Sequence, residues 1–172
     1  MTTARLTWVA ADLAHLDAEL ESPARLAALL GARVPASWPP GEWDADALRW
    51  VRARLAAEGE RARGWYAGYA LQDAADGGPP MLVAAGGYFG PPGVDGGVEI
   101  GYSVVPEARR RGIATTMIGV LAARALGTPG VVYVRAHAFA HNEASWRALA
   151  RAGFTRTGAT NDEGAERWEL RA

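Results

Sequence analysis

The sequence contains no cysteine and no lysine among its 172 residues. Without cysteine the chain can form no disulfide and no thiolate metal site, and it offers no thiol nucleophile. Without lysine it has neither a Walker-type phosphate loop nor an internal Schiff base to pyridoxal phosphate, because both require a lysine amine. Every permanently cationic side chain is therefore an arginine.

The sequence also lacks a long apolar run and a strong net charge. The N-terminal stretch is interrupted by Asp12, His15, Asp17 and Glu19, so we expect no signal peptide and no membrane span, and we expect a cytoplasmic protein. A formal net charge of −1 gives no overall basic field, which argues against nucleic-acid binding. The length fits one domain, over residues 1–172, that buries its own core.

Apolar periodicity and turn-forming residues predict an α+β chain in which helices and strands alternate. Strands are predicted over 6–9, 65–71, 81–88, 98–105, 131–136, 154–157 and 166–171. Helices are predicted over 11–30 with a division at Pro23, from a cap at Asp44 to near Gly59, over 113–126, and from a cap at Asn142 to 152. The segment 98–136 therefore forms a strand, helix, strand crossover.

The loop Arg109 to Ala114 (RRRGIA) is the most informative segment, because it lies between a predicted strand and a predicted helix. An R-x-x-G-x-A loop turns backbone N–H groups toward one point at a helix start, where the helix dipole adds positive charge. Such a loop can bind a pyrophosphate. The alternative is an exposed basic turn before an ordinary helix.

Two segments together resemble the GNAT superfamily of N-acetyltransferases. The first is 98–114 (VEIGYSVVPEARRRGIA), which is similar to the family's fourth strand, pyrophosphate loop and following helix. The second is 142–154 (NEASWRALARAGF), which resembles the N-x-x-S and G-F elements of the subgroup that contains ribosomal-protein alanine acetyltransferases. Their order and spacing make a chance match much rarer than for either segment alone.

The resemblance implies a fold, a reaction and a donor. The fold is a mixed, twisted sheet of about seven strands with helices on both faces, in α/β/α layers. The strands 98–105 and 131–136 would be parallel neighbours that splay apart to admit the pantetheine arm of acetyl-CoA. The reaction is direct attack of a primary amine on acetyl-CoA, with no covalent enzyme intermediate and no metal. The acceptor is a small-molecule amine or a protein N-terminus, and similar proteins are often homodimers.

The resemblance also implies which residues hold the cofactor. Backbone amides from Arg110 to Thr115 would donate to the pyrophosphate, with arginine side chains adding charge. Asn142 would contact the pantetheine arm and Ser145 would hydrogen-bond the departing thiolate, although Asn142 also suits a helix cap. The full predicted set is Ser103, Val104, Val105, Arg109, Arg110, Arg111, Gly112, Ile113, Ala114, Thr115, Asn142 and Ser145.

Glu99 is the candidate general base. Strand alternation places Glu99, Gly101 and Ser103 on one face, where small neighbours leave room for a substrate. An alkyl amine with a solution pKa of about 10 is protonated at neutral pH, so a carboxylate that is positioned directly or through a water can accept its proton. Some family members use a Glu at this strand position. The alternative is a carboxylate that is merely solvated on the sheet face.

The helix that starts at Asn142 departs from the family, because it lacks the Tyr that many relatives use as general acid. This departure motivates an alternative function, an acyl-CoA-binding module that has lost its chemistry. The two functions share every cofactor residue. They differ at Glu99 and at the acceptor pocket.

His137 and His141 have the spacing of a helical metal pair, but they lie on a strand end and in a loop, so we expect no zinc site. His141 is either an auxiliary base or a solvated loop histidine. Trp38, Trp43 and Trp50 gather around the first long loop and helix. The family places the acceptor pocket there, and aromatic walls would suit a hydrophobic or cationic amine, while core packing is the alternative role.

Overall fold

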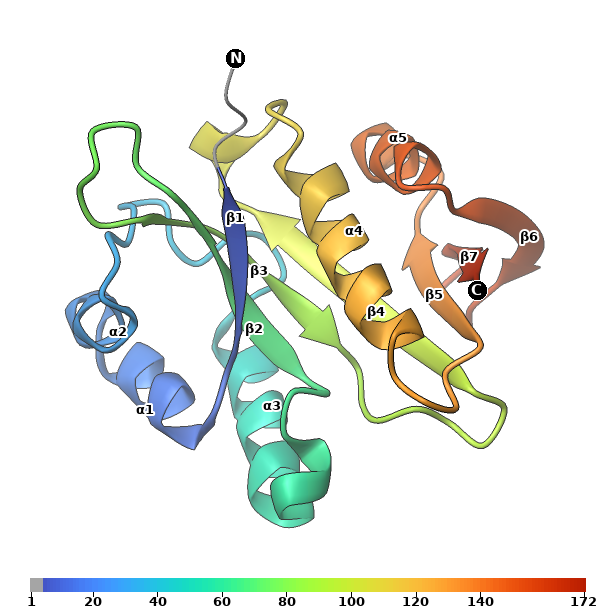
Figure 1. The fold of residues 1–172 in the computed structure, drawn as a ribbon, viewed down its shortest axis with the longest axis horizontal. Coiled ribbons are helices and arrows are strands. Elements are labelled where there is room, and N and C mark those ends of the chain that lie inside the picture. Colours follow the sequence, from blue (N-terminus) through green and yellow to red (C-terminus); the bar gives the residue numbers. More distant parts are fainter. Residues whose placement is uncertain (1–4) are drawn as a thin grey trace.

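The computed structural model describes residues 5–172, and within them a seven-stranded sheet forms the centre of the molecule (Figure 1). The strands are β1 (Leu6–Ala10), β2 (Ala67–Gln72), β3 (Met81–Tyr88), β4 (Gly97–Val104), β5 (Tyr133–Ala138), β6 (Thr155–Thr160) and β7 (Glu166–Arg171). They lie in the order β1-β2-β3-β4-β5-β7-β6, and β4 and β5 pair in parallel while the other neighbours pair antiparallel. The predicted mixed sheet is confirmed.

Helices cover both faces of this sheet. They are α1 (Leu13–Glu21), α2 (Pro23–Leu30), α3 (Ala45–Glu58), α4 (Ile113–Leu126) and α5 (Glu143–Arg151), with short 3-10 turns at Gly59–Ala62 and Pro106–Ala108. The Tyr69 hydroxyl of β2 reaches α1, whereas the Tyr88 hydroxyl of β3 donates to the Leu121 carbonyl of α4 at 2.7 Å. Tyr69 pairs with Ala85 of β3, and the side chains of Ala85 and Tyr88 point to opposite faces of the sheet. Helices α1 and α4 therefore lie on opposite faces. In Figure 1, α4 crosses in front of β4. Among residues 5–172, no helix is both long and apolar enough to span a membrane.

Local sequence sets the helix boundaries as predicted. The helical segment before residue 31 divides at Pro23, because Ser22 ends α1 and caps α2 by accepting from the Arg25 amide. The Asp44 side chain caps α3, which ends at Gly59. These three predictions are confirmed.

Several strand boundaries differ from the prediction by a few residues. The strand predicted over 131–136 occupies Tyr133–Ala138, because Val131 and Val132 belong to the turn that bonds back to Thr128 and Gly96. The strand predicted from residue 65 begins at Ala67, since the Trp65 amide closes a turn on Ala62. The strand predicted over 154–157 extends to Thr160 across an irregularity in its pairing with β7.

The parallel pair β4 and β5 splays apart along its length. Only three residue pairs join the two strands, from Gly97 with Tyr133 to Glu99 with Arg135. Beyond them β4 stays paired with β3 to Val104, and β5 stays paired with β7 to Ala138. Each strand keeps one neighbour and loses the other, so the sheet opens toward the carboxyl ends of β4 and β5. The implied splay is confirmed.

Candidate active site

A cleft of about 810 Å³ lies between β4, the turn that follows it, and the N-terminal ends of α4 and α5. Its lining residues are Tyr102, Ser103, Val104, Ala108, Arg109, Arg110, Gly112, Ile113, Ala114, Thr115, Asn142, Ala144, Ser145, Arg147, Ala148 and Arg151. Most of the residues predicted to hold a cofactor are therefore brought together. Val105 and Arg111 are not part of the lining, and the Val105 amide is already bonded to the Val83 carbonyl.

The loop before α4 forms one end of the cleft. Arg110 has φ +60°, a left-handed conformation that is costly for a side chain with a Cβ, and Gly112 has φ +78°. This alternation turns successive N–H groups inward, as in other anion-binding loops. The amides of Ile113, Ala114 and Thr115 follow in the first turn of α4, where an N–H has no acceptor within the helix. The loop therefore has the backbone geometry of an anion-binding loop.

The side chains that line the cleft also favour an anionic ligand. Arg109, Arg110, Arg147 and Arg151 line it, and none of its lining residues is a carboxylate. The Arg109 Nε donates to the Val104 carbonyl at 3.0 Å, which fixes its guanidinium beside the loop. A cleft with several arginines and a helix N-terminus favours a ligand with more than one anionic group.

The N-terminus of α5 brings Ser145 to the cleft. Asn142 caps this helix, since its Oδ1 accepts from the Ser145 amide at 3.2 Å. The Ser145 Oγ lies 2.6 Å from the Tyr102 hydroxyl, which reaches it from β4. Burial raises the pKa of Tyr102, while the Ser145 hydrogen bond acts in the opposite direction. Sequence reasoning missed this contact, although strand alternation did place Tyr102 on the face opposite Glu99.

A second, smaller pocket of about 180 Å³ adjoins the cleft. Its lining residues are Glu42, Trp43, Ala47, Trp50, Val51, Ala67, Ala85, Gly86, Gly87, Tyr88, Phe89, Gly101, Tyr102 and Ser103. Tyr102 and Ser103 line both spaces, so the cleft and the pocket meet on the part of β4 that no longer pairs with β5. Two of the three tryptophans considered for an acceptor pocket, Trp43 and Trp50, are in this lining.

Trp38, the third of these tryptophans, belongs to the support of the pocket rather than to its wall. Its indole N–H donates to Glu19 Oε1 at 2.6 Å, and the Trp43 indole donates to the same oxygen at 2.9 Å. The Tyr69 hydroxyl donates to Glu19 Oε2 at 2.6 Å. Burial raises the pKa of Glu19 despite these three hydrogen bonds. No local sequence pattern indicates this role, because Glu19, the two tryptophans and Tyr69 come from three separate segments of the chain.

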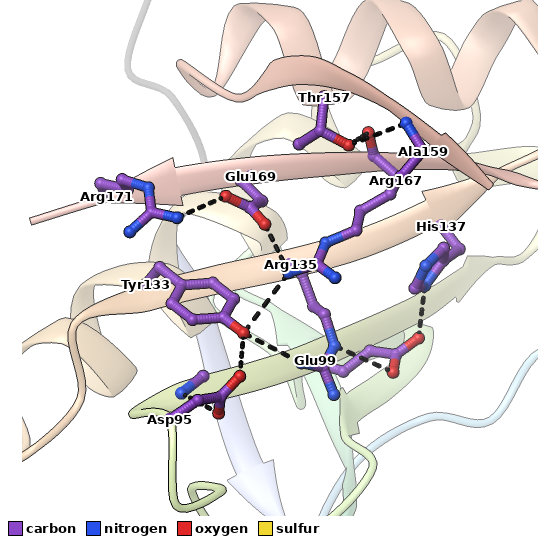
Figure 2. Close-up of polar contacts among 11 residues, drawn as sticks. Asp95, Glu99, Tyr133, Arg135, His137, Thr157, Ala159, Arg167, Glu169 and Arg171 are labelled. Atoms are coloured by element: carbon purple, nitrogen blue, oxygen red, sulfur yellow. Dashed lines mark hydrogen bonds and ion pairs between the residues drawn. The ribbon is translucent and has the colours of Figure 1, made fainter. Parts of the chain in front are cut away.

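Glu99 lies in a network of charged side chains on β4, β5 and β7 (Figure 2). Its Oε1 is 2.7 Å from His137 Nδ1, and its Oε2 is 3.5 Å from Arg135 Nε. Glu99 lines neither the cleft nor the pocket. A Cβ on Gly101 would lie 2.7 Å from the Phe89 ring, so this ring packs on the strand between Glu99 and Ser103. Glu99 is thus on the predicted face of β4, and the Phe89 ring lies between it and the pocket residue Ser103.

His137 at the end of β5 and His141 in the following loop contact different residues. His137 contacts Glu99, whereas the exposed His141 ring stacks on Phe139 with centroids 5.4 Å apart. Across residues 5–172, no group of three or more His, Cys, Asp or Glu side chains is arranged to hold a metal ion.

The family model of the GNAT acetyltransferase domain matches residues 6–155. The chain belongs to the GNAT acetyltransferase family. The matched model describes an acetyltransferase domain, so this protein is an acyltransferase. No curated protein matches the chain by sequence.

Solved structures share the fold at low sequence identity. A variant of spermidine N-acetyltransferase SpeG from Vibrio cholerae is 14% identical with a TM-score of 0.62, and the match covers 96% of this chain and 93% of that one. Aminoglycoside acetyltransferase AAC(6')-Ib, solved with coenzyme A and kanamycin, is 14% identical with a TM-score of 0.61, covering 97% and 95%. At these identities the likeness shows the GNAT fold, and the acceptor has to be argued from the pocket.

Proposed function

We propose that this GNAT domain acetylates a primary amine with one positive charge and an apolar or aromatic body, using acetyl-CoA as donor. The observation that carries the proposal is that the cleft and the smaller pocket, which differ in their chemistry, meet at Tyr102 and Ser103. The cleft offers arginines and helix amides, and the pocket offers aromatic rings. A donor with several phosphates and an apolar amine would approach the same point from opposite sides.

The donor side is supported by the chemistry of the cleft. The pyrophosphate would lie at the loop of Arg110 and Gly112, where the amides of α4 point. The pantetheine arm would run through the splay between β4 and β5 and pass Asn142, which brings the thioester to Ser145. Nearby arginines would neutralise the remaining phosphate charge.

The acceptor side is supported by the composition of the pocket. Trp43, Trp50 and Phe89 supply rings that can bury an apolar body and attract an ammonium group. Glu42 is the one carboxylate in the lining, so the pocket matches a single positive charge. Spermidine and kanamycin carry several. A protein N-terminus, which the resemblance to ribosomal-protein alanine acetyltransferases implies, presents one charge but also a polar backbone.

We propose Glu99 as the base, with His137 as its hydrogen-bond partner. The amine must lose a proton before its nitrogen can attack. Glu99 is on the same face of β4 as Gly101 and Ser103, so a water beside the Phe89 ring can carry the proton from the pocket to the carboxylate.

The proposal is tested by measuring free thiol release from acetyl-CoA across a panel of amines. Phenethylamine and tryptamine should be acetylated with a higher kcat/KM than spermidine, kanamycin and an alanine-terminated peptide. Replacing Trp50 by Ala should lower kcat/KM for the arylalkylamines by about tenfold, because one wall of the pocket is lost. Preference for spermidine, kanamycin or the peptide would refute the acceptor class. Absence of thiol release with retained acetyl-CoA binding would favour the acyl-CoA-binding module.

A further inference from the structure

We propose that Tyr102 is the proton donor for the departing coenzyme A sulfur, acting through the Ser145 hydroxyl. This inference rests on the proposed function, since it concerns the leaving group of the same reaction. It assigns to a residue of β4 the role that the helix α5 cannot fill, because residues 143–151 include no tyrosine.

The need for a donor comes from the chemistry of the leaving group. Cleavage of the carbon–sulfur bond leaves the electron pair on sulfur, so the sulfur departs as a thiolate unless a proton reaches it, and an alkyl thiol with a pKa of about 8.5 holds that proton at neutral pH. A positioned acid typically accelerates such a step about 10² to 10⁴-fold. The remaining hydroxyl of α5, Ser145, is a weak acid by itself and needs a stronger acid behind it.

The placement of Tyr102 meets this need. Its side chain lines the cofactor cleft together with Ser145, at the place where the cleft meets the acceptor pocket. The two oxygen atoms are 2.6 Å apart, so one proton is shared along this line. When the phenol donates to Ser145 Oγ, the serine proton is free to point into the cleft. Burial raises the pKa of Tyr102, which keeps the phenol protonated at neutral pH.

In the transfer step the acetyl group moves from the coenzyme A sulfur to the amine nitrogen. The amine nitrogen forms a bond to the acetyl carbon, and the carbon–sulfur bond breaks with its electron pair on sulfur. The Ser145 proton passes to that sulfur while the Tyr102 proton passes to Ser145 Oγ. The proton that the nitrogen loses on becoming an amide returns through solvent to the Tyr102 oxygen. The products are the N-acetyl amine and the free thiol, and both side chains end in their starting state.

The experiment compares Tyr102→Phe, Ser145→Ala and the double variant in the thiol-release assay, with Tyr66→Phe as matched control. Tyr66 also donates one hydroxyl hydrogen bond, to Glu58 at 2.7 Å, and lines neither space. We expect Tyr102→Phe to lower kcat about 100-fold with little change in acetyl-CoA affinity. The double variant should be no slower than the slower single variant, because the two residues form one relay.

Two further readouts separate proton donation from a structural role. The wild-type kcat should fall on the alkaline side as the phenol ionises, and Tyr102→Phe should lack this limb. The deficit of Tyr102→Phe should shrink with S-phenyl thioacetate, whose more acidic thiol leaves without a proton. Ser145→Ala, in the first turn of α5, tests the relay separately if Tyr102→Phe folds poorly.

The inference fails if Tyr102→Phe keeps the wild-type kcat and alkaline limb, or if its loss lies wholly in the KM for acetyl-CoA. Failure of the proposed function has a different signature. In that case the wild-type protein prefers another acceptor class, or releases no thiol with any amine, and in the latter case the inference falls with it.

Discussion

Replacing Glu19 by Ala should remove the hydrogen bonds that support the acceptor pocket and lower the free energy of unfolding. The Glu19 carboxylate accepts from the Trp38 and Trp43 indoles and from the Tyr69 hydroxyl, and these three side chains are at most 8% exposed. Alanine removes all three acceptor contacts together. Trp43 also lines the pocket, so the same change should raise the KM for the acceptor amine.

The size of the effect follows from the number of donors left without a partner. Each buried donor that loses its acceptor costs about 1–3 kcal/mol. Three such donors would cost at least about 3 kcal/mol, and we expect the low end because water can enter the space of the missing carboxylate and the buried charge disappears with it. For a chain of this length that loss corresponds to a Tm lower by about 6–12 °C.

Glu19→Gln is the matched control for this experiment. Its Oε1 can keep both indole hydrogen bonds, and its amide can donate to the Tyr69 oxygen, which accepts as well as donates. We expect the free energy of unfolding of this variant to stay within about 1 kcal/mol of the wild type at neutral pH. Urea unfolding followed by tryptophan fluorescence measures both variants.

The pH dependence of the free energy of unfolding provides a second test. Because burial raises the pKa of Glu19 above its ordinary value of 4.5, the folded state binds the proton more tightly than the unfolded state. The stabilisation by this proton is fully present below pH 4.5 and is lost as the pH rises through the raised pKa. The wild type should therefore lose stability relative to Glu19→Gln as the pH rises above 4.5. An Ala variant within about 1 kcal/mol of the wild type, or a pH-independent difference from Gln, would refute the reasoning.

Two further predictions concern the donor and the base. Saturating acetyl-CoA at about 100 times its Kd should stabilise the wild type by about 2.7 kcal/mol in a thermal-shift titration. Gly112→Leu should abolish this shift, whereas Gly77→Leu, with the same left-handed backbone and the same open surroundings but outside the cleft, should keep it. Glu99→Gln should lower kcat while calorimetry finds acetyl-CoA affinity nearly intact. Unchanged turnover, with a loss in Glu42→Gln instead, would move the role of base to Glu42.

The lining of the cleft could be predicted from the sequence because it is built mostly from neighbouring residues. A turn residue, a glycine and a helix start within six positions define the loop Arg109 to Ala114, and the backbone itself supplies the N–H groups that would bind a phosphate. The cap at Asn142 is equally local. Strand alternation gave the correct face for Glu99, because a period of two needs no knowledge of the partner strand.

The remaining parts depend on contacts between distant segments. Glu19 meets Tyr69 across 50 positions of the chain, and Tyr102 meets Ser145 across 43. Neither pair leaves a local pattern, since a glutamate on a short helix and a tyrosine on a strand are ordinary residues there. The position of Glu99 beside His137 and Arg135 also depends on the register of β4 with β5, which the alternation of one strand cannot supply.

The alternation of side chains along β4 explains how one position of the fold can face both the cleft and the pocket. Successive residues of a strand point to opposite faces, so Tyr102 turns toward α5 while Ser103 turns toward the face of α1. If β5 continued to pair with β4, the sheet would separate the Tyr102 and Ser103 side chains. The pairing ends at Glu99, so both side chains lie at an open edge of the sheet. Gly86 lies opposite Tyr102 and lets β4 and Met117 approach where any Cβ would collide. The missing helix tyrosine therefore does not leave the leaving group without an acid, because the splayed strand presents a phenol to the same point.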